Sequence, residues 1–146
     1  MNCIFLDCDG VLNSTHGWLR DKPNTWKYLT PECVEQLRQL LNALPDIKIV
    51  ISSTWRKMML INEFREMFNS FNLPGDRIIG YTKIRLSDRA RGYEIQEYLD
   101  EHPEIEKFVI IDDDADMAHL LSHLVQTDAT KGLTQEDVLE VAKRFK

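Results

Sequence analysis

Three short apolar runs in this 146-residue chain each end abruptly in polar side chains. The runs span residues 3–6, 47–51 and 108–111, and the polar groups that follow them are Asp7 with Asp9, Ser52 with Ser53, and Asp112 with Asp113. A short apolar run without polar alternation is typical of a strand that is buried on both faces of a parallel sheet. Ligands bind outside the carboxyl ends of such strands, so we expect these side chains to form one site.

Between the apolar runs, hydrophobic residues recur at the spacing of amphipathic helices. Thr30 and Pro31 are a typical helix start, and Thr134 is expected to cap a C-terminal helix. The pattern predicts further helices over residues 57–69, 92–101 and 117–121, and weaker strands over 77–82 and 124–126. Residues 13–29 show no periodicity and are predicted to be a loop or flap. Strands that alternate with helices predict one α/β domain over residues 1–146, with helices on both faces of a parallel sheet.

Charge and cysteine content exclude several classes of protein. Eighteen basic and 24 acidic side chains give a net charge of −6, which argues against a nonspecific nucleic-acid coat but not against a local grip on a strand end. The three cysteines show no CxxC spacing, so we expect a reduced, cytoplasmic protein without disulfides. No apolar run approaches the roughly 20 residues that span a bilayer, and no signal peptide or membrane partner is expected. His119 and His123 lack the glutamate of a zinc-protease helix.

The four carboxylates at the predicted sheet edge indicate the chemistry of the site. They would repel one another without a cation among them. An all-oxygen ligand set suits Mg²⁺, with Asp7, Asp9, Asp112 and Asp113 as the candidate metal residues. A carboxylate nucleophile, Mg²⁺ and nearby hydroxyl groups together are typical of phosphoryl transfer on a phosphorylated substrate.

This arrangement resembles the haloacid dehalogenase (HAD) superfamily of phosphatases. Residues 4–12 read IFLDCDGVL, which matches the first superfamily motif, hhhhDxDGhh, with h hydrophobic. The resemblance implies that Asp7 is the nucleophile that forms an aspartyl-phosphate. It also implies that Asp9 is the general acid and base, and that the main-chain carbonyl of Asp9 binds Mg²⁺.

The other superfamily motifs also have counterparts in the chain. The resemblance implies that Ser52, with Ser53 as the alternative, binds the phosphoryl group, and that Arg91 holds both this group and the nucleophile. Three other basic residues are alternatives to Arg91: Lys83, Arg85 and Arg89. In the last motif, Asp113 is expected to contact the metal directly, with Asp112 in support.

A narrower resemblance is to the short, capless HAD domains of bacterial and phage RNA-repair proteins. It rests on the segments DxDGVLN, SSTWR, RGxEI and DDDxDM. It implies five parallel strands in the order 5-4-1-2-3, a Rossmann-like fold. The gaps between the motifs leave no room for a cap domain, so we expect an open site.

An open site favours a substrate that supplies its own enclosure, and the terminal phosphate of a polynucleotide is the substrate we expect. Arg56 is a candidate contact to it, while Trp18 and Trp26 are predicted either to stack on a base or to pack the flap against the core. The alternative substrate is a small metabolite or a mononucleotide. The alternative of another class, a non-catalytic domain that binds phosphate or protein, would have no use for the second acid, Asp9.

Overall fold

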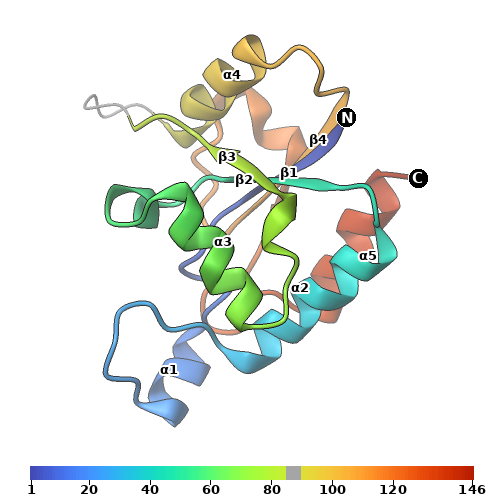
Figure 1. Ribbon diagram of the computed structural model, residues 1–146. Coiled ribbons are helices and arrows are strands. Elements are labelled where there is room, and N and C mark those ends of the chain that lie inside the picture. The colour runs from blue at the N-terminus through green and yellow to red at the C-terminus, as the bar shows by residue number, and fades with distance from the viewer. Residues whose placement is uncertain (85–89) are drawn as a thin grey trace.

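Five parallel strands form one sheet at the centre of the computed structural model, which describes residues 1–84 and 90–146 (Figure 1). The strands are β1 (Asn2–Leu6), β2 (Lys48–Ile51), β3 (Ile78–Tyr81), β4 (Lys107–Asp112) and β5 (Leu124–Gln126). Their order is β3-β2-β1-β4-β5, and every pair is parallel. The predicted α/β fold and strand order are therefore confirmed.

Register in the sheet aligns the strand ends that carry the polar side chains. Leu6 lies between Ile51 on β2 and Ile111 on β4. Beyond this level, the amide of Asp7 donates to the carbonyl of Ile111 at 3.0 Å. The amide of Ser52 likewise donates to the carbonyl of Leu6 at 2.8 Å. The first polar residues after β1, β2 and β4 thus meet at one edge.

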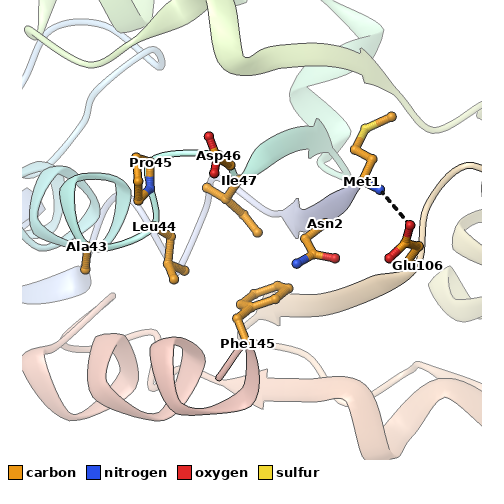
Figure 2. A pocket seen from close by; sticks show the side chains of 9 residues that line it. All are labelled: Met1, Asn2, Ala43, Leu44, Pro45, Asp46, Ile47, Glu106 and Phe145. Carbon is orange, nitrogen blue, oxygen red and sulfur yellow. Dashed lines mark ion pairs between the residues drawn. The ribbon is translucent and has the colours of Figure 1, made fainter.

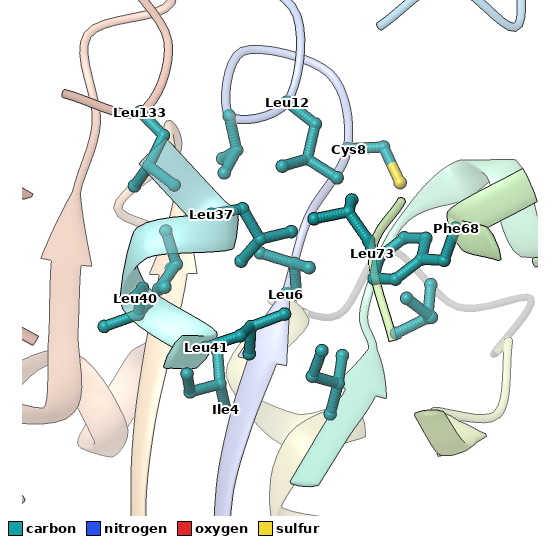
Figure 3. Close-up of a cluster of buried hydrophobic side chains, with 14 of the residues drawn as sticks. Ile4, Leu6, Cys8, Leu12, Leu37, Leu40, Leu41, Phe68, Leu73 and Leu133 are labelled. Carbon is teal, nitrogen blue, oxygen red and sulfur yellow. The ribbon is translucent and has the colours of Figure 1, made fainter. Parts of the chain in front are cut away.

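Helices cover both faces of the sheet, as predicted (Figure 1). One face packs against α2 (Pro31–Ala43), α3 (Ile61–Ser70) and α5 (Gln135–Arg144). The other packs against α4 (Arg91–Glu101) and the 3-10 helix η3 (Ala118–His123). The larger core lies on the first face, where leucines of α2 meet β1 and Cys8 is buried among them (Figure 3). All three cysteines are buried and free.

Three local predictions are corrected by the structure. Residues 13–29 are not a continuous loop, because they contain helix α1 (Thr15–Asp21), which is capped by the Ser14 hydroxyl. The helix predicted over 57–69 is two elements, the 3-10 helix η1 (Thr54–Lys57) and α3, since the Glu63 carboxylate accepts from the amide of Leu60 and starts α3 at Ile61. The helix predicted over 117–121 is the 3-10 helix η3. A further 3-10 turn, η2 (Gly75–Arg77), precedes β3.

The connections that could hold a cap domain are short. Between β1 and α2 the chain forms only α1 and its flanking turns. Between β2 and β3 it forms η1, α3 and η2, which belong to the domain itself. Within residues 1–84 and 90–146, the prediction of a fold without a cap domain is confirmed. Among the described helices, none has the length and apolar character needed to cross a bilayer.

Candidate functional site

Three carboxylates meet at the carboxyl edge of the sheet. Asp7 follows β1, Asp112 ends β4 and Asp113 comes next, and one oxygen of each lies within 4.8 Å of the others. Asp7 and Asp112 are buried, while Asp113 is half-buried. The sequence predicted a meeting of four carboxylates from the strand ends, and the structure brings three of them together. Asp9 lies on the same loop but is exposed, and its carboxylate is not part of the cluster.

Arg91 places one positive charge against this cluster. Its Nη1 lies 3.2 Å from Asp7 Oδ1 and 3.0 Å from Asp112 Oδ2. It also donates to the main-chain carbonyl of Ser52 at 2.8 Å. The alternative Lys83 is exposed and pairs with Glu101 at 2.8 Å, away from the cluster. The other two alternatives, Arg85 and Arg89, lie outside the described residues.

One arginine does not balance three acids, and burial of two of these acids raises their pKa values. Burial, and next the charge of Asp112, raise the pKa of Asp7 to about 9, although Arg91 opposes the shift. Burial also raises the pKa of Asp112 to about 6, again against Arg91. Burial makes it unfavourable for these clustered carboxyl groups to be charged when no cation is present. A hard divalent cation bound to their oxygens would favour the charged forms. Asp7, Asp112 and Asp113 could therefore hold a divalent metal ion.

Gly10 allows the loop after β1 to pass close to Asp113. Its φ is +79°, and a Cβ at this position would lie 2.4 Å from Asp113 Oδ2. The carbonyl of Gly10 also accepts a 2.7 Å hydrogen bond from the buried hydroxyl of Thr127, beyond β5. Any larger residue would displace either the loop or the Asp113 carboxylate. The glycine of the DxDG motif thus has a steric explanation.

The serines after β2 have different partners. The Ser53 hydroxyl accepts from the amide of Trp55 at 3.2 Å and caps η1. The Ser52 hydroxyl is buried and has no hydrogen-bond partner among the described residues. Of the two candidates, Ser52 thus has the unused hydroxyl group at the edge of the sheet.

Arg56, expected to contact substrate, is buried and bound to other protein groups. Its Nη2 donates to Glu94 Oε2 at 2.9 Å, and its Nη1 donates to the carbonyl of Ser53 at 2.6 Å. The ion pair between Arg56 and Glu94 joins η1 to α4, the helix that begins at Arg91. In the structure, Arg56 therefore fixes the loop after β2.

Two polar residues that support the site were missed by sequence reasoning. The side-chain Nδ2 of Asn13 donates to Asp9 Oδ1 at 2.9 Å and to the main-chain carbonyl of Tyr28 at 3.2 Å. Its side-chain Oδ1 accepts from the main-chain amide of Gly10. The Asp116 carboxylate accepts from the amide of Arg91, and the main-chain carbonyl of Asp116 accepts from the amide of Gly92, so Asp116 holds the first turn of α4. Both residues belong to segments that carry the narrower resemblance, DxDGVLN and DDDxDM, and this was the available sequence signal.

The aromatic residues of the flap are neither fully packed nor fully free. Trp18 makes an edge-to-face contact with Tyr28 at 5.6 Å, and Trp26 makes one with the buried Trp55 at 5.3 Å. Both indoles still expose about two-fifths of their surface, 43% and 41% respectively. Each prediction for these residues, stacking surface or core contact, describes part of what the structure shows.

The two histidines on η3 are bound to different neighbours. His119 Nε2 is 2.8 Å from the amide oxygen of Gln96. The His123 ring stacks on Phe108 at 4.2 Å.

Two hollows of similar size lie at opposite ends of the sheet. One, of about 370 Å³, is lined by Asp9 and Asp113 and by Trp18 and Leu19 of α1. We call it the α1 groove. The other, of about 360 Å³, lies at the amino-terminal end of the sheet, where Phe145 faces Asn2, and contains none of the predicted site residues (Figure 2). The groove next to the acids is therefore the hollow that concerns the site.

Comparison with known proteins agrees with this geometry. One family model, described as the HAD domain in Swiss Army Knife RNA repair proteins, matches residues 3–138. No curated protein and no solved structure matches significantly. The matched region contains every residue of the acidic cluster, together with Ser52 and Arg91. The chain belongs to the haloacid dehalogenase (HAD) domains of Swiss Army Knife RNA repair proteins.

Proposed function

We propose that this protein is a magnesium-dependent phosphohydrolase that transfers the phosphoryl group of a monoester first to Asp7 and then to water. One observation carries the proposal: the Asp7 carboxylate lies within a cluster of three acids and 3.2 Å from the Arg91 guanidinium. Such a carboxylate, placed beside a cation and at the open end of a strand, can attack phosphorus. Membership of a HAD family supports a hydrolytic reaction.

The reaction requires two proton transfers, and we assign both to Asp9. In the first step Asp7 attacks phosphorus, the bond to the leaving oxygen breaks, and Asp9 gives that oxygen its proton. In the second step, water attacks the phosphorus of the aspartyl-phosphate and loses a proton to Asp9. The bond between phosphorus and the Asp7 oxygen breaks, which releases phosphate and restores the Asp7 carboxylate. The hydrogen bond from Asn13 to Asp9 Oδ1 leaves Oδ2 as the oxygen that carries the proton.

Arg91 and Ser52 are suited to hold the phosphoryl group. Arg91 already contacts Asp7, so its guanidinium can bridge the nucleophile and a phosphoryl oxygen by charge-assisted hydrogen bonds. The unpartnered Ser52 hydroxyl can donate to a second oxygen. Asp7, Asp113 and the Asp9 carbonyl would bind Mg²⁺ with Asp112 in support, and the ion would neutralise charge on the phosphoryl group and favour ionised Asp7.

The substrate we propose is a phosphate at the end of a polynucleotide. The absence of a cap among the described residues leaves the site open, and the family description refers to RNA repair. Contacts to nucleotides beyond the reacting one could lower the barrier where no cap encloses a small substrate. The net charge of −6 opposes broad contact with a phosphate backbone, so the grip would be local.

A nucleophile test separates this proposal from a non-catalytic binding domain. Wild-type protein with Mg²⁺ should hydrolyse a nitrophenyl phosphate, and radiolabelled phosphate should be trapped on the protein by rapid acid quench. Asp7→Asn should abolish both signals. Asp114→Asn is the matched control, because it removes one negative charge from an exposed acid of the same edge. Activity of Asp7→Asn within about tenfold of wild type, a barrier change of only ~1.4 kcal/mol, would contradict the assignment.

A second comparison decides between the two substrate classes. Catalytic efficiency should be measured on 3′- and 5′-phosphorylated oligonucleotides and on the matching mononucleotides. We expect an oligonucleotide to be the better substrate. Equal or faster hydrolysis of the mononucleotide would favour the small-metabolite alternative.

A further inference from the structure

We infer that the α1 groove is the subsite for the terminal nucleoside, with its base stacked against Trp18 and Leu19 of α1. The groove adjoins the site, because Asp9 and Asp113 line it together with these two apolar side chains. The inference rests on the proposed function, since it assigns a place to the leaving group of that reaction.

The position of Asp9 decides which part of the substrate lies in the groove. A general acid must be within hydrogen-bond reach of the oxygen that it protonates. In a phosphate monoester this is the oxygen of the leaving alcohol. Asp9 is exposed and lines the groove, whereas Asp7 is buried. The alcohol, here the terminal nucleoside, therefore leaves on the groove side.

The wall that carries Trp18 is firmly attached to the domain. The amides of Thr15 and His16 both donate at 3.1 Å to carbonyls of the loop after β5, at Ala129 and Thr130. Gly17 packs so closely on Thr30 that a Cβ would lie 2.5 Å from its hydroxyl oxygen. Tyr28 supports the edge of the Trp18 ring. The α1 groove is thus a preformed surface.

The chemistry of this wall favours stacking over base-specific hydrogen bonds. Trp18 and Leu19 are exposed by 43% and 66%, which leaves apolar area for a flat ring. The polar side chains nearby are already used: Asn13 holds Asp9 and Tyr28, and the Ser14 hydroxyl caps α1. Every base presents a flat face to an aromatic ring, whereas sequence readout requires unused donors and acceptors. We expect a preference for a base but little discrimination among bases.

The test compares substrates with and without a terminal base. Oligonucleotides carrying a 3′- or 5′-phosphate on either a normal or an abasic terminal nucleotide are assayed with wild-type protein and Mg²⁺. At the preferred end, the base should raise kcat/KM by at least ~10-fold, as expected for one base–aromatic stack. In Trp18→Ala this ratio should fall to about 2 or less, and Trp18→Phe should restore most of it. Leu19→Ala should lower the ratio to an intermediate value.

Trp26→Ala is the matched control. Trp26 is equally exposed but does not line the groove, so the ratio of base-bearing to abasic substrate should stay at the wild-type value. Far-ultraviolet circular dichroism and melting curves establish that each variant is folded. Exchange among the four bases should change kcat/KM by no more than about threefold, because stacking tolerates sequence.

Binding gives a readout that does not depend on turnover. The same oligonucleotides are titrated into Asp7→Asn protein and its double variant with Trp18→Ala, and the ratios of dissociation constants should follow the kinetic ratios. A base effect that is absent in wild type, or that persists in Trp18→Ala, would overturn the subsite. If no phosphate ester is hydrolysed, the proposed function fails, while the binding ratios still decide where the base lies.

Discussion

Gly92 should be required for the placement of Arg91, and Gly92→Ala tests this directly. A Cβ at residue 92 would lie 2.0 Å from the main-chain oxygen of Met117 and 2.3 Å from its carbon. Side-chain carbons essentially never approach other atoms below 3.0 Å, so the start of α4 and the segment before η3 must separate by about 1 Å. Arg91 is the neighbouring residue and must move with the helix.

Two opposing effects set the stability of Gly92→Ala. Alanine favours a helix over glycine by at most ~1 kcal/mol, while overpacking a tight contact costs ~1–3 kcal/mol. We expect a net loss of ~1–2 kcal/mol and a melting temperature lower by about 3–6 °C. Activity should fall further, because a displacement of ~1 Å in a site can cost 10²-fold in rate. Melting curves and kcat/KM on a nitrophenyl phosphate measure the two effects.

Gly75→Ala is the matched control for this prediction. A Cβ at residue 75 would lie 2.3 Å from the main-chain oxygen of Arg65, a similar clash located between α3 and β3. It should lower the melting temperature comparably and leave kcat/KM of the folded protein unchanged. Truncation of the Met117 side chain should not rescue Gly92→Ala, because the clash is with main-chain atoms. Unchanged stability with activity within about threefold of wild type would refute the reasoning.

Three further predictions concern Asp9, the metal and pH. Asp9→Asn should slow hydrolysis of an alkyl phosphate by ~10²–10⁴-fold and of a nitrophenyl phosphate by less, since nitrophenolate leaves without a proton. Equal losses of rate on the two substrates would contradict the role of Asp9 as the acid. Mn²⁺ should replace Mg²⁺ and soft metals should not, and Asp113→Asn should raise the metal concentration needed for half-maximal activity; an unchanged requirement would remove Asp113 from the ligand set. The pKa of Asp7 is raised from 3.8 to about 9, so its protonated form stabilises the metal-free fold, fully below pH ~4 and progressively less as the pH rises toward 9. Thermal melts in a chelator should therefore show that stability falls as the pH rises across this range. Mg²⁺ or Asp7→Asn should make this dependence on pH weaker, and an equal dependence in that variant would assign the effect to other groups.

The sequence predicts the centre of the site because parallel topology determines it. Once β1, β2 and β4 are recognised as strands of one sheet, Asp7, Ser52 and Asp112 must meet at its carboxyl edge. Arg91 could be selected only through the family motif, because four basic residues are close together in the sequence. The structure shows why the motif includes a glycine: Gly92 allows α4 to approach Met117.

What the sequence does not predict depends on local contacts without a periodic pattern. Helix α1 has seven residues, too few for a clear amphipathic repeat, and Ser14, Gly17 and the loop after β5 hold it in place. The contact of Arg56 with substrate stays a prediction, and the sequence does not show that Glu94 lies opposite Arg56. The α1 groove was also missed, because it forms only when α1 packs beside the acids.

The central position of β1 also has a consequence for how the protein becomes active. The hydrogen bond from Thr127 to Gly10 joins positions 117 residues apart, and β1 pairs with β4 before the acids can meet. During synthesis, β1 can therefore complete these contacts only after nearly the whole domain has left the ribosome. Pairing between residues that are distant in the sequence slows folding. An amino-terminal fragment that ends before β4 lacks Asp112 and Asp113 and so cannot assemble the acidic cluster. In a denaturant titration, activity and β-sheet content should consequently disappear in one transition.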